Sequence, residues 1–463
     1  MKNNINQLIP PFLQTLMNIF REEGHQLYLV GGCVRDWLME QECHDYDMTT
    51  NATPEQMLSL AKKHHFNAVP TGKKHGTITF IMAQHTIEIT TFREEKEYEK
   101  HRFPKSVTFT HSLQEDVKRR DFTINAIAMD ENGIYDYHGG CSDLKKGLVR
   151  CVNDPQLRFE EDALRILRAL RFSFQLNFVI EDGTWQAIQE KAHLLRYISL
   201  ERIRDELCKI LMSDHDDLLV ILRASRVLDV IFPEFIPTYE CEQETPWHIH
   251  NVFYHMNAVM NASKGYSLPM KLALLFHDIE KPSHKTYDER GNAHFLGHAE
   301  AGAETAKIIM KRLKFDHSTI QQVTKMIYYH DYYMYDNRKS VHKLMYYLNG
   351  DFTIAFQILK IQLADNMGKN QKKCMEKNRM IYAVTIMLKQ MQKDKECFTI
   401  KDLAINGNDM LSLGYQGKEI KEGFEYLLRF ILNQQEKNNK EQLCKEAQRY
   451  LERKRSNENF NRQ

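Results

Sequence analysis

Short apolar runs alternate with helical stretches only in the first third of the chain. The four runs occupy residues 26–30, 45–49, 76–82 and 86–92, and their length and β-branched content predict strands. From Asp154 and Pro155, a favourable helix N-cap and first-turn pair, the pattern becomes helical almost to the last residue. The sequence therefore predicts an α+β head with a small mixed sheet, followed by a mostly α-helical remainder.

A chain of 463 residues is long enough for roughly three domains of ~150 residues each. A proline-containing stretch at 232–248 and a glycine-containing stretch at 394–414 are the clearest further boundaries. We therefore expect four parts, at residues 1–150, 151–235, 236–393 and 394–463. The charged, weakly periodic residues 93–106 predict a mobile loop within the head.

The composition is that of an ordinary globular protein, with 42% hydrophobic residues, 27% charged residues and a formal net charge of +1. The nine cysteines are scattered without a CxxC pair, which argues against disulfide frameworks and zinc knuckles. The first 14 residues lack the apolar core of a signal peptide, and no apolar run is long enough to cross a bilayer. We expect a cytoplasmic protein with no membrane contact; the sequence does not indicate an oligomeric state.

Two aspartates alternate in the second apolar run, as Asp45 and Asp47 of "HDYDMTT". On a strand, residues i and i+2 project to the same face, and two neighbouring carboxylates repel each other unless a cation lies between them. Mg²⁺ suits such a pair, since it is commonly shared between carboxylates and substrate phosphates. Glu88 of "TIEITTF" is a third candidate carboxylate for a two-metal site. The alternative is that an isolated D-x-D is a turn or a solvated strand end.

A glycine pair and an arginine precede these aspartates in "LVGGCVRD". Gly31 and Gly32 would let the backbone approach phosphate groups closely, and Arg35 could offer them a charged fork. The stretch is not a dinucleotide-binding loop, because it lacks the G-x-G-x-x-G spacing and the acidic pair follows too early.

Residues 160–168, "EEDALRILR", predict a helix on which Asp162, Arg165 and Arg168 recur at steps of three, and all three are candidate nucleotide-binding residues. Cytosine and adenine each present an exocyclic amino donor beside a ring-nitrogen acceptor. Asp162 could accept from the amino group while Arg165 donates to the ring nitrogen, and uracil and guanine would mismatch this pair. The alternative is a solvated helix face with an intrahelical ion pair.

Four ordered blocks over about the first 215 residues resemble the class II nucleotidyltransferases, the family of CCA-adding enzymes and bacterial poly(A) polymerases. The blocks are "LVGGCVRD…DYD", "RRDFTINAIAMD", "RFEEDALRILRALRF" and "LERIRDELCKIL". The resemblance implies that Glu161, Asp162 and Arg165 form the base-selecting E-D-x-x-R motif. It also implies that Arg120, Asp121 and Asn125 hold the sugar and triphosphate, and that residues 93–104 are the flexible loop that reorients the site for the final adenosine.

The middle of the chain carries histidines and aspartates in an order that suits a divalent transition metal, in a mononuclear or binuclear site. The stretch resembles the HD phosphohydrolase superfamily, which implies the ligand set His255, His277, Asp278, His298, His330 and Asp365 and a metal such as Mn, Ni or Fe. His294 is an alternative ligand. With 21 histidines in the chain, chance matches are easy, and a lone HD pair is usually a core or capping feature.

The last part, "DLAINGNDMLSLGYQGKEIKEGFEYLL", resembles the tail of HD-containing members of the CCA-adding family. This resemblance implies that the tail grips tRNA, with Lys418 and Lys421 among the phosphate contacts. The alternative is an ordinary solvated helix face.

Together these resemblances imply template-independent addition of CCA to tRNA 3′ ends, with CTP and ATP as substrates and Mg²⁺ as cofactor, and a second phosphohydrolase activity in the HD domain. Alternatives are a poly(A) polymerase or A-adding enzyme, and an HD phosphohydrolase with a non-catalytic RNA-binding head. A (p)ppGpp synthetase–hydrolase also joins the two chemistries but normally carries its HD domain first.

Overall fold

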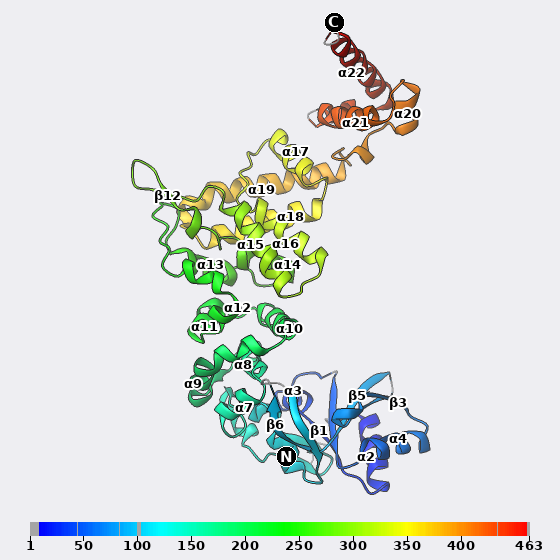
Figure 1. The fold of residues 1–463 in the computed structure, drawn as a ribbon, viewed down its shortest axis with the longest axis vertical. Coiled ribbons are helices and arrows are strands. Elements are labelled where there is room, and N and C mark those ends of the chain that lie inside the picture. Colours follow the sequence, from blue (N-terminus) through cyan, green and yellow to red (C-terminus); the bar gives the residue numbers. More distant parts are fainter. Residues whose placement is uncertain (1–8, 44, 83, 100–102, 433, 461–463) are drawn as a thin grey trace. The chain divides into compact units, whose positions relative to one another are not determined.

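The computed structural model describes residues 9–43, 45–82, 84–99, 103–432 and 434–460. The chain divides into two compact units (Figure 1). The first comprises Met1–Glu234 with Arg312–Lys314, and the second comprises Phe235–Lys311 with Phe315–Gln463.

A mixed sheet forms the head of the first unit and, within the described residues, has seven strands in the order β3-β4-β5-β2-β1-β8-β9. β2 and β5 pair in parallel, and the other neighbours pair antiparallel. The strands are β1 Leu27–Val30, β2 Tyr46–Thr50, β3 Asn67–Gly72, β4 Thr77–Met82, β5 His85–Thr91, β8 Ala128–Asp130 and β9 Gly133–Tyr135.

Two helices, α2 (Pro11–Glu22) and α4 (Pro54–Lys63), pack on one face of this sheet (Figure 1). Alternate residues of the parallel strands, such as Ile87 and Ile89, are fully buried in the core beneath them. Because side chains alternate along a strand, the intervening residues of β2 and β5 project to the opposite face. That second face is therefore free of this core and available for polar side chains.

The predicted strands correspond to β1, β2, β4 and β5 within a residue or so at each end. The predicted loop at 93–106 is wrong in its described part: β6 (Arg93–Glu99) and β7 (Phe103–Phe109) pair as an antiparallel ladder. Residues 100–102 lie outside the described residues. β6 is built largely from Glu, Lys and Tyr and has no period-2 apolar pattern, so its pairing with β7 leaves little hydrophobic signal in the sequence.

After the sheet the first unit is helical, in line with the pattern change at residue 154. Its later helices are α7 Pro155–Glu161, α8 Leu164–Leu176, α9 Asp182–Lys191, α10 Leu200–Leu211, α11 Leu218–Ala224 and α12 Val227–Ile231. The prediction of one helix over 160–168 is wrong, because the chain leaves the helix at Asp162, whose backbone is extended. The Asp162 carboxylate accepts the Leu164 N–H at 3.1 Å, which supports the start of the next helix instead.

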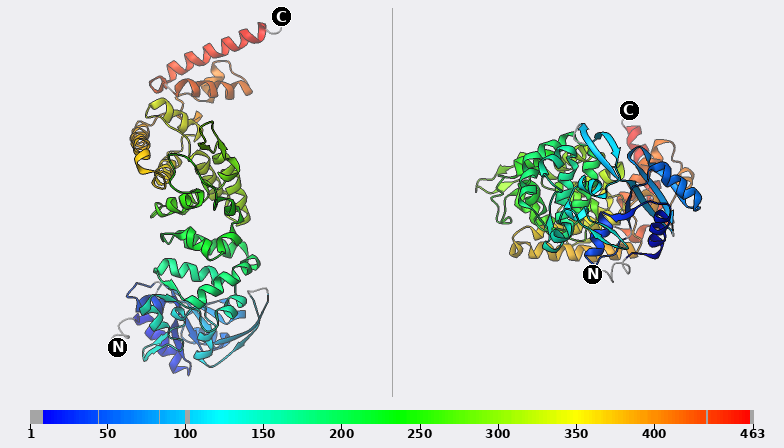
Figure 2. Two further views of the ribbon diagram at one scale, coloured as in Figure 1. Left: turned by 90° about the vertical axis from the view of Figure 1, so that its left-hand side faces the viewer. Right: turned by 90° about the horizontal axis from the view of Figure 1, so that it is seen from below.

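The second unit is almost entirely helical (Figure 2). Its main helices are α13 Val252–Asn261, α14 Leu268–Phe276, α15 His298–Arg312, α16 His317–Tyr329, α17 Arg338–Tyr347, α18 Phe352–Met367, α19 Gln371–Lys393, α20 Gly407–Ser412, α21 Lys418–Ile431 and α22 Lys440–Phe460. Residues 397–451 have an apolar cluster of their own, centred on Leu427, Ile431 and Leu443. Within the described residues, every helix is too short or too polar to cross a membrane. The fold confirms a mixed-sheet head followed by a mostly helical region.

Candidate functional site

Asp47 and Glu88 are side-by-side partners on the parallel strands β2 and β5, on the sheet face opposite the apolar core. Asp45 precedes β2 and is two residues away, so its side chain belongs to the same face. Desolvation raises the pKa of Asp47, and the Glu88 and Asp45 carboxylates raise it further, while Arg120 lowers it. The three carboxylates thus form a negative patch at the middle of the sheet.

Gly31 ends β1 with φ 81° and ψ −135°, a conformation essentially restricted to glycine. The position of a Cβ on Gly31 lies 3.4 Å from Arg120 Nη1 and 3.9 Å from Asp47 Oδ2. The turn, a guanidinium and a metal-type carboxylate are therefore neighbours, although Arg120 comes from a different sequence block than Gly31 and Asp47. Gly32 begins α3 (Gly32–Leu38), and a Cβ there would lie 3.6 Å from Arg35 Nη2.

A hydrogen-bonded chain connects the next four predicted nucleotide-binding residues. Arg35 Nη1 donates to Asn125 Oδ1 at 2.8 Å, and Asn125 Nδ2 donates to Asp121 Oδ1 at 3.3 Å. Arg168 Nε donates to Asp121 Oδ2 at 2.7 Å. Burial alone would raise the pKa of Asp121, but Arg168 holds it below its ordinary value. Asp121 is therefore ionised and already engaged in this structure.

The two predicted base-reading residues each have a different partner. Arg165 is buried, and its guanidinium donates to Glu161 Oε2 at 2.6 Å and to two backbone carbonyls. Asp162 faces Arg202 of α10, whose Nη2 donates to Oδ2 at 2.9 Å and whose Nη1 donates to Oδ1 at 3.3 Å. Sequence reasoning missed Arg202, although it lies in the fourth block, "LERIRDELCKIL".

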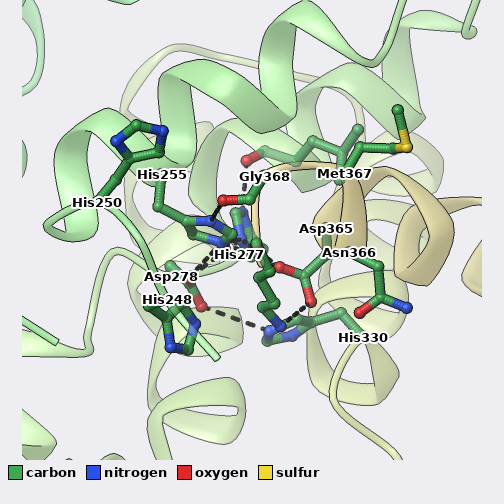
Figure 3. A network of polar contacts seen from close by, with 12 residues as sticks. His248, His250, His255, His277, Asp278, His330, Asp365, Asn366, Met367 and Gly368 are labelled. Carbon is green, nitrogen blue, oxygen red and sulfur yellow. Dashed lines mark hydrogen bonds and ion pairs between the residues drawn. The ribbon is translucent and has the colours of Figure 1, made fainter. Parts of the chain in front are cut away.

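In the second unit, six side chains from five helices and their ends converge on one point. His255, His277 and Asp278 approach Asp365, and the two atoms His255 Nε2 and Asp365 Oδ1 are 2.9 Å apart (Figure 3). Asp278 also belongs to a second group with His298 and His330, and its Oδ1 lies 3.3 Å from His298 Nε2. Each group has the size and residue types of a metal site, and Asp278 is common to both.

Each of the four histidines of this cluster is held by a contact between its Nδ1 atom and a backbone carbonyl. Their Nδ1 atoms lie 2.6–3.1 Å from the carbonyl oxygens of Gly368, Leu274, Phe295 and Ile327, for His255, His277, His298 and His330 respectively. A ring that donates through Nδ1 presents the Nε2 lone pair, and the Nε2 atoms are the ones that converge. The donor set therefore fits one or two divalent ions.

Two lysines compensate the carboxylates of the cluster, and sequence reasoning did not single them out. Lys281 Nζ lies 2.7 Å from Asp278 Oδ2, and Lys369 Nζ lies 2.5 Å from Asp365 Oδ2. Burial would raise the pKa of Asp278, but His277 and Lys281 hold it well below its ordinary value. The neighbouring Asp278 and Asp365 in turn outweigh burial and raise the pKa of His277 to about 9.

An open cavity of about 460 Å³ leads to the cluster. Its wall carries three lysines and several aromatic rings, among them Lys281, Lys369, Lys377, Trp247 and Tyr328. Lys377 Nζ lies 4.5 Å from the centre of the Trp247 ring. Cationic groups beside metal-type ligands are suited to an anionic substrate such as a phosphoester.

Three further candidate residues are in neither metal-type ligand group: His294, Lys418 and Lys421. His294 lines the cavity, but its Nε2 lies 3.3 Å from Asp288 Oδ2 and it is in neither metal-type group. Lys421 is exposed on α21, with Glu425 Oε1 4.0 Å from its Nζ, and Lys418 is the first residue of that helix.

Three family models match the chain. Residues 27–150 match the poly A polymerase head domain, and residues 177–238 match a domain described as "Probable RNA and SrmB- binding site of polymerase A". Residues 285–447 match tRNA nucleotidyltransferase domain 2.

Among curated relatives, the CCA-adding enzyme of Lactobacillus helveticus is 48% identical over 206 residues, which are 44% of this chain and 50% of that protein. The CCA-adding enzyme of Staphylococcus epidermidis is 44% identical over 216 residues, 46% of this chain and 52% of that protein. The chain thus aligns with about half the length of these relatives. The Bacillus stearothermophilus CCA-adding enzyme, solved with CTP, superimposes with a TM-score of 0.67 at 25% identity, covering 98% of this chain and 100% of that one.

The sheet and its carboxylate face lie within the residues that match the poly A polymerase head domain. The chain is thus similar to CCA-adding tRNA nucleotidyltransferases in sequence, over about half the length of the curated relatives, and in fold.

Proposed function

We propose that this protein adds CCA to the 3′ end of tRNA without a template, with CTP and ATP as substrates. The observation that carries the proposal is the meeting of the Gly31 turn, Arg120 and Asp47 beside Glu88 on one face of the sheet. In the reaction, the RNA 3′-hydroxyl attacks the α-phosphate of the nucleotide and pyrophosphate leaves.

Asp45, Asp47 and Glu88 would hold Mg²⁺, since carboxylate oxygens are its preferred protein ligands. When bound, the metal supplies positive charge that favours the attacking hydroxyl and the leaving pyrophosphate. The Gly31–Gly32 turn gives phosphates close access to the backbone, and Arg35, Arg120 and Arg168 supply cationic donors. Asp121 and Asn125 fix Arg168 and Arg35, and they can accept or donate at the ribose.

The base is selected by Asp162 and Arg165. Glu161 orients the Arg165 guanidinium, and Arg202 orients the Asp162 carboxylate. A cytosine or adenine presents an amino donor to Asp162 and a ring acceptor to Arg165, whereas uracil and guanine leave hydrogen bonds unmade. Unmade hydrogen bonds in a buried site give strong discrimination.

The test is incubation of the full chain with Mg²⁺, an unmodified tRNA transcript and each of the four NTPs, singly and together. We expect incorporation of CTP and ATP only, and loss of incorporation in Asp45→Ala. UTP incorporation equal to that of CTP, or an active Asp45→Ala variant, would refute the proposal. An assay with CTP as the only nucleotide distinguishes a poly(A) polymerase or A-adding enzyme from a CCA-adding enzyme. Only a CCA-adding enzyme should incorporate CTP into a tRNA that lacks all three terminal nucleotides.

We also propose that the His–Asp cluster is an HD-type centre for two divalent transition-metal ions, such as Mn, Ni or Fe, and that it hydrolyses phosphoesters. Two histidine–carboxylate groups that share Asp278, beside a lysine-lined cavity, favour this second function. When bound, the ions supply Lewis acidity, while Lys281, Lys369 and Lys377 attract the phosphate oxygens. Phosphate release from 2′,3′-cyclic nucleotides with added Mn²⁺ or Ni²⁺ tests it; no turnover with any metal would reduce the domain to a scaffold.

We further propose a division of the chain into a catalytic head (1–150), a base-selecting neck (151–235), an HD domain (236–393) and a tRNA-binding tail (394–463); the carboxylate face in the first part and the His–Asp cluster in the third favour it. We further infer that the protein acts in the cytoplasm, where tRNA maturation requires it.

A further inference from the structure

Three arginine side chains surround one aromatic ring in the first unit. The guanidinium carbons of Arg35, Arg168 and Arg171 lie 5.1, 5.4 and 4.4 Å from the centre of the Phe172 ring. A guanidinium within about 6 Å of a ring centre is attracted by the electrons of the ring face. Phe172 is 7% exposed, so these contacts are shielded from water and correspondingly stronger.

The ring also touches the second sequence block. Phe122, which directly follows Asp121, packs edge-on against Phe172 with a centroid distance of 5.7 Å. Arg35 comes from α3 beside the glycine turn, and Arg168 comes from α8. One side chain of α8 thus contacts Arg168 of its own helix and two other segments that carry predicted nucleotide-binding residues.

Each guanidinium also has a polar partner. Arg35 donates to Asn125 and to Asp36, Arg168 donates to Asp121, and Arg171 Nε lies 3.0 Å from Glu206 Oε2. The three cations also repel one another, since burial and the charges of Arg168 and Arg35 lower the pKa of Arg171. A polyanion placed against such a cluster would relieve this repulsion.

We propose that Phe172 is a positioning residue of the nucleotide site, whose ring fixes the guanidinium groups of Arg35 and Arg168 for the triphosphate. This inference deepens the proposed nucleotidyl transfer and rests on it. Because the triphosphate is common to CTP and ATP, Phe172 affects the binding of both nucleotides equally. The choice of base belongs to Asp162 and Arg165 and is independent of the ring.

The test compares variants of the full chain by calorimetric titration with CTP, ATP and pyrophosphate in the presence of Mg²⁺. Phe172→Leu keeps an apolar side chain but removes the ring, and Phe172→Tyr keeps the ring. Phe174→Leu is the matched control: Phe174 is also on α8, is 3% exposed, and contacts the His215 ring.

We expect Phe172→Leu to weaken binding of all three ligands about tenfold, as the loss of two shielded cation–π contacts implies. Phe172→Tyr should restore affinity to within about twofold, and Phe174→Leu should leave it unchanged. In transfer assays Phe172→Leu should raise KM for CTP and ATP alike, with discrimination against UTP unchanged.

Unchanged pyrophosphate affinity in Phe172→Leu, or an equal loss in Phe174→Leu, would overturn the inference. So would a wild-type protein that binds neither nucleotide nor pyrophosphate. If the wild-type protein transfers no nucleotide but Phe172→Leu still lowers pyrophosphate affinity, the proposed function fails and the arginine-positioning role stands.

Discussion

The carboxylate of Asp162 and the guanidinium of Arg202 face each other through two hydrogen bonds of 2.9 and 3.3 Å. Asp162 lies in the break between α7 and α8, and its backbone is extended. The Leu164 N–H also donates to this carboxylate, at 3.1 Å. Arg202, on the neighbouring α10, and the start of α8 therefore hold the Asp162 carboxylate together, and Arg202 supplies the charged partner.

Replacing Arg202 tests this relationship. Arg202→Ala should lower the preference for CTP over UTP about tenfold, because an unfixed Asp162 makes less specific hydrogen bonds with the base. Arg202→Lys should recover only part of the preference, since a lysine does not form the bidentate pair. The measurement is kcat/KM for CTP and UTP in primer extension. Lys209→Ala removes an exposed cation from the same helix and should behave as the wild type; an equal loss in that variant would contradict the assignment.

The Gly31 turn provides a second prediction. Gly31→Ala should cost about 1–3 kcal/mol of unfolding free energy, because φ 81° with ψ −135° is strained for alanine. Its Cβ would also approach Arg120 Nη1 at 3.4 Å, so nucleotide KM should rise. Gly24→Ala is the control, with φ 80° and nothing within 4 Å of the new Cβ. It should show a comparable loss of thermal stability with unchanged KM; a matching rise in KM would show that strain alone explains the Gly31 effect.

The metal content of the second unit should depend on which ligand is removed. Asp278 is common to both ligand groups, so Asp278→Asn should reduce or abolish occupancy of both. His298→Asn should affect only the group with Asp278 and His330, and His255→Asn only the other group. Elemental analysis after dialysis against Mn²⁺ should give about two ions per wild-type chain, about one for either histidine variant, and fewer for Asp278→Asn. Equal stoichiometry in all variants would argue against a shared ligand.

The protonation of His277 predicts that the stability of the metal-free protein depends more strongly on pH than that of the metal-loaded protein. Its pKa is raised to about 9 by Asp278 and Asp365, above the value of about 6.5 expected for an unfolded chain. The resulting stabilisation is complete below about pH 6.5 and is lost as pH rises through 9. Metal binding requires the neutral ring, so apparent metal affinity should increase over the same range.

Thermal unfolding of EDTA-treated and Mn²⁺-loaded protein between pH 6.5 and 9 measures this difference. The metal-free melting temperature should fall more steeply with pH than the metal-loaded one. His277→Gln should flatten the metal-free curve, and identical slopes for wild type and variant would assign the effect to other groups.

Local sequence patterns predicted β1, β2, β4 and β5 of the head sheet, because these runs are short, apolar and rich in β-branched residues, but they did not predict the described strands β3, β8 and β9. They also failed for β6, whose charged side chains carry no such pattern, for its partner β7, and for the helix break at Asp162. The break depends on the tertiary partner Arg202 and on the N–H of Leu164, and neither contact is encoded in helical periodicity. The candidate metal ligands were found by their order along the chain. The lysines Lys281 and Lys369 were not, because only the folded structure shows which cations face the carboxylates.

Those two lysines also affect the order in which folding and metal binding take place in the second unit. Small zinc domains fold only around their ion, because their ligands have no other counter-charge. Here Lys281 and Lys369 already neutralise Asp278 and Asp365, and four backbone carbonyls already orient the imidazoles. If the proposed centre binds metal, we expect the polypeptide to complete its folding first and to bind ions afterwards, so that metal supply would govern the maturation of the centre without limiting the yield of folded protein.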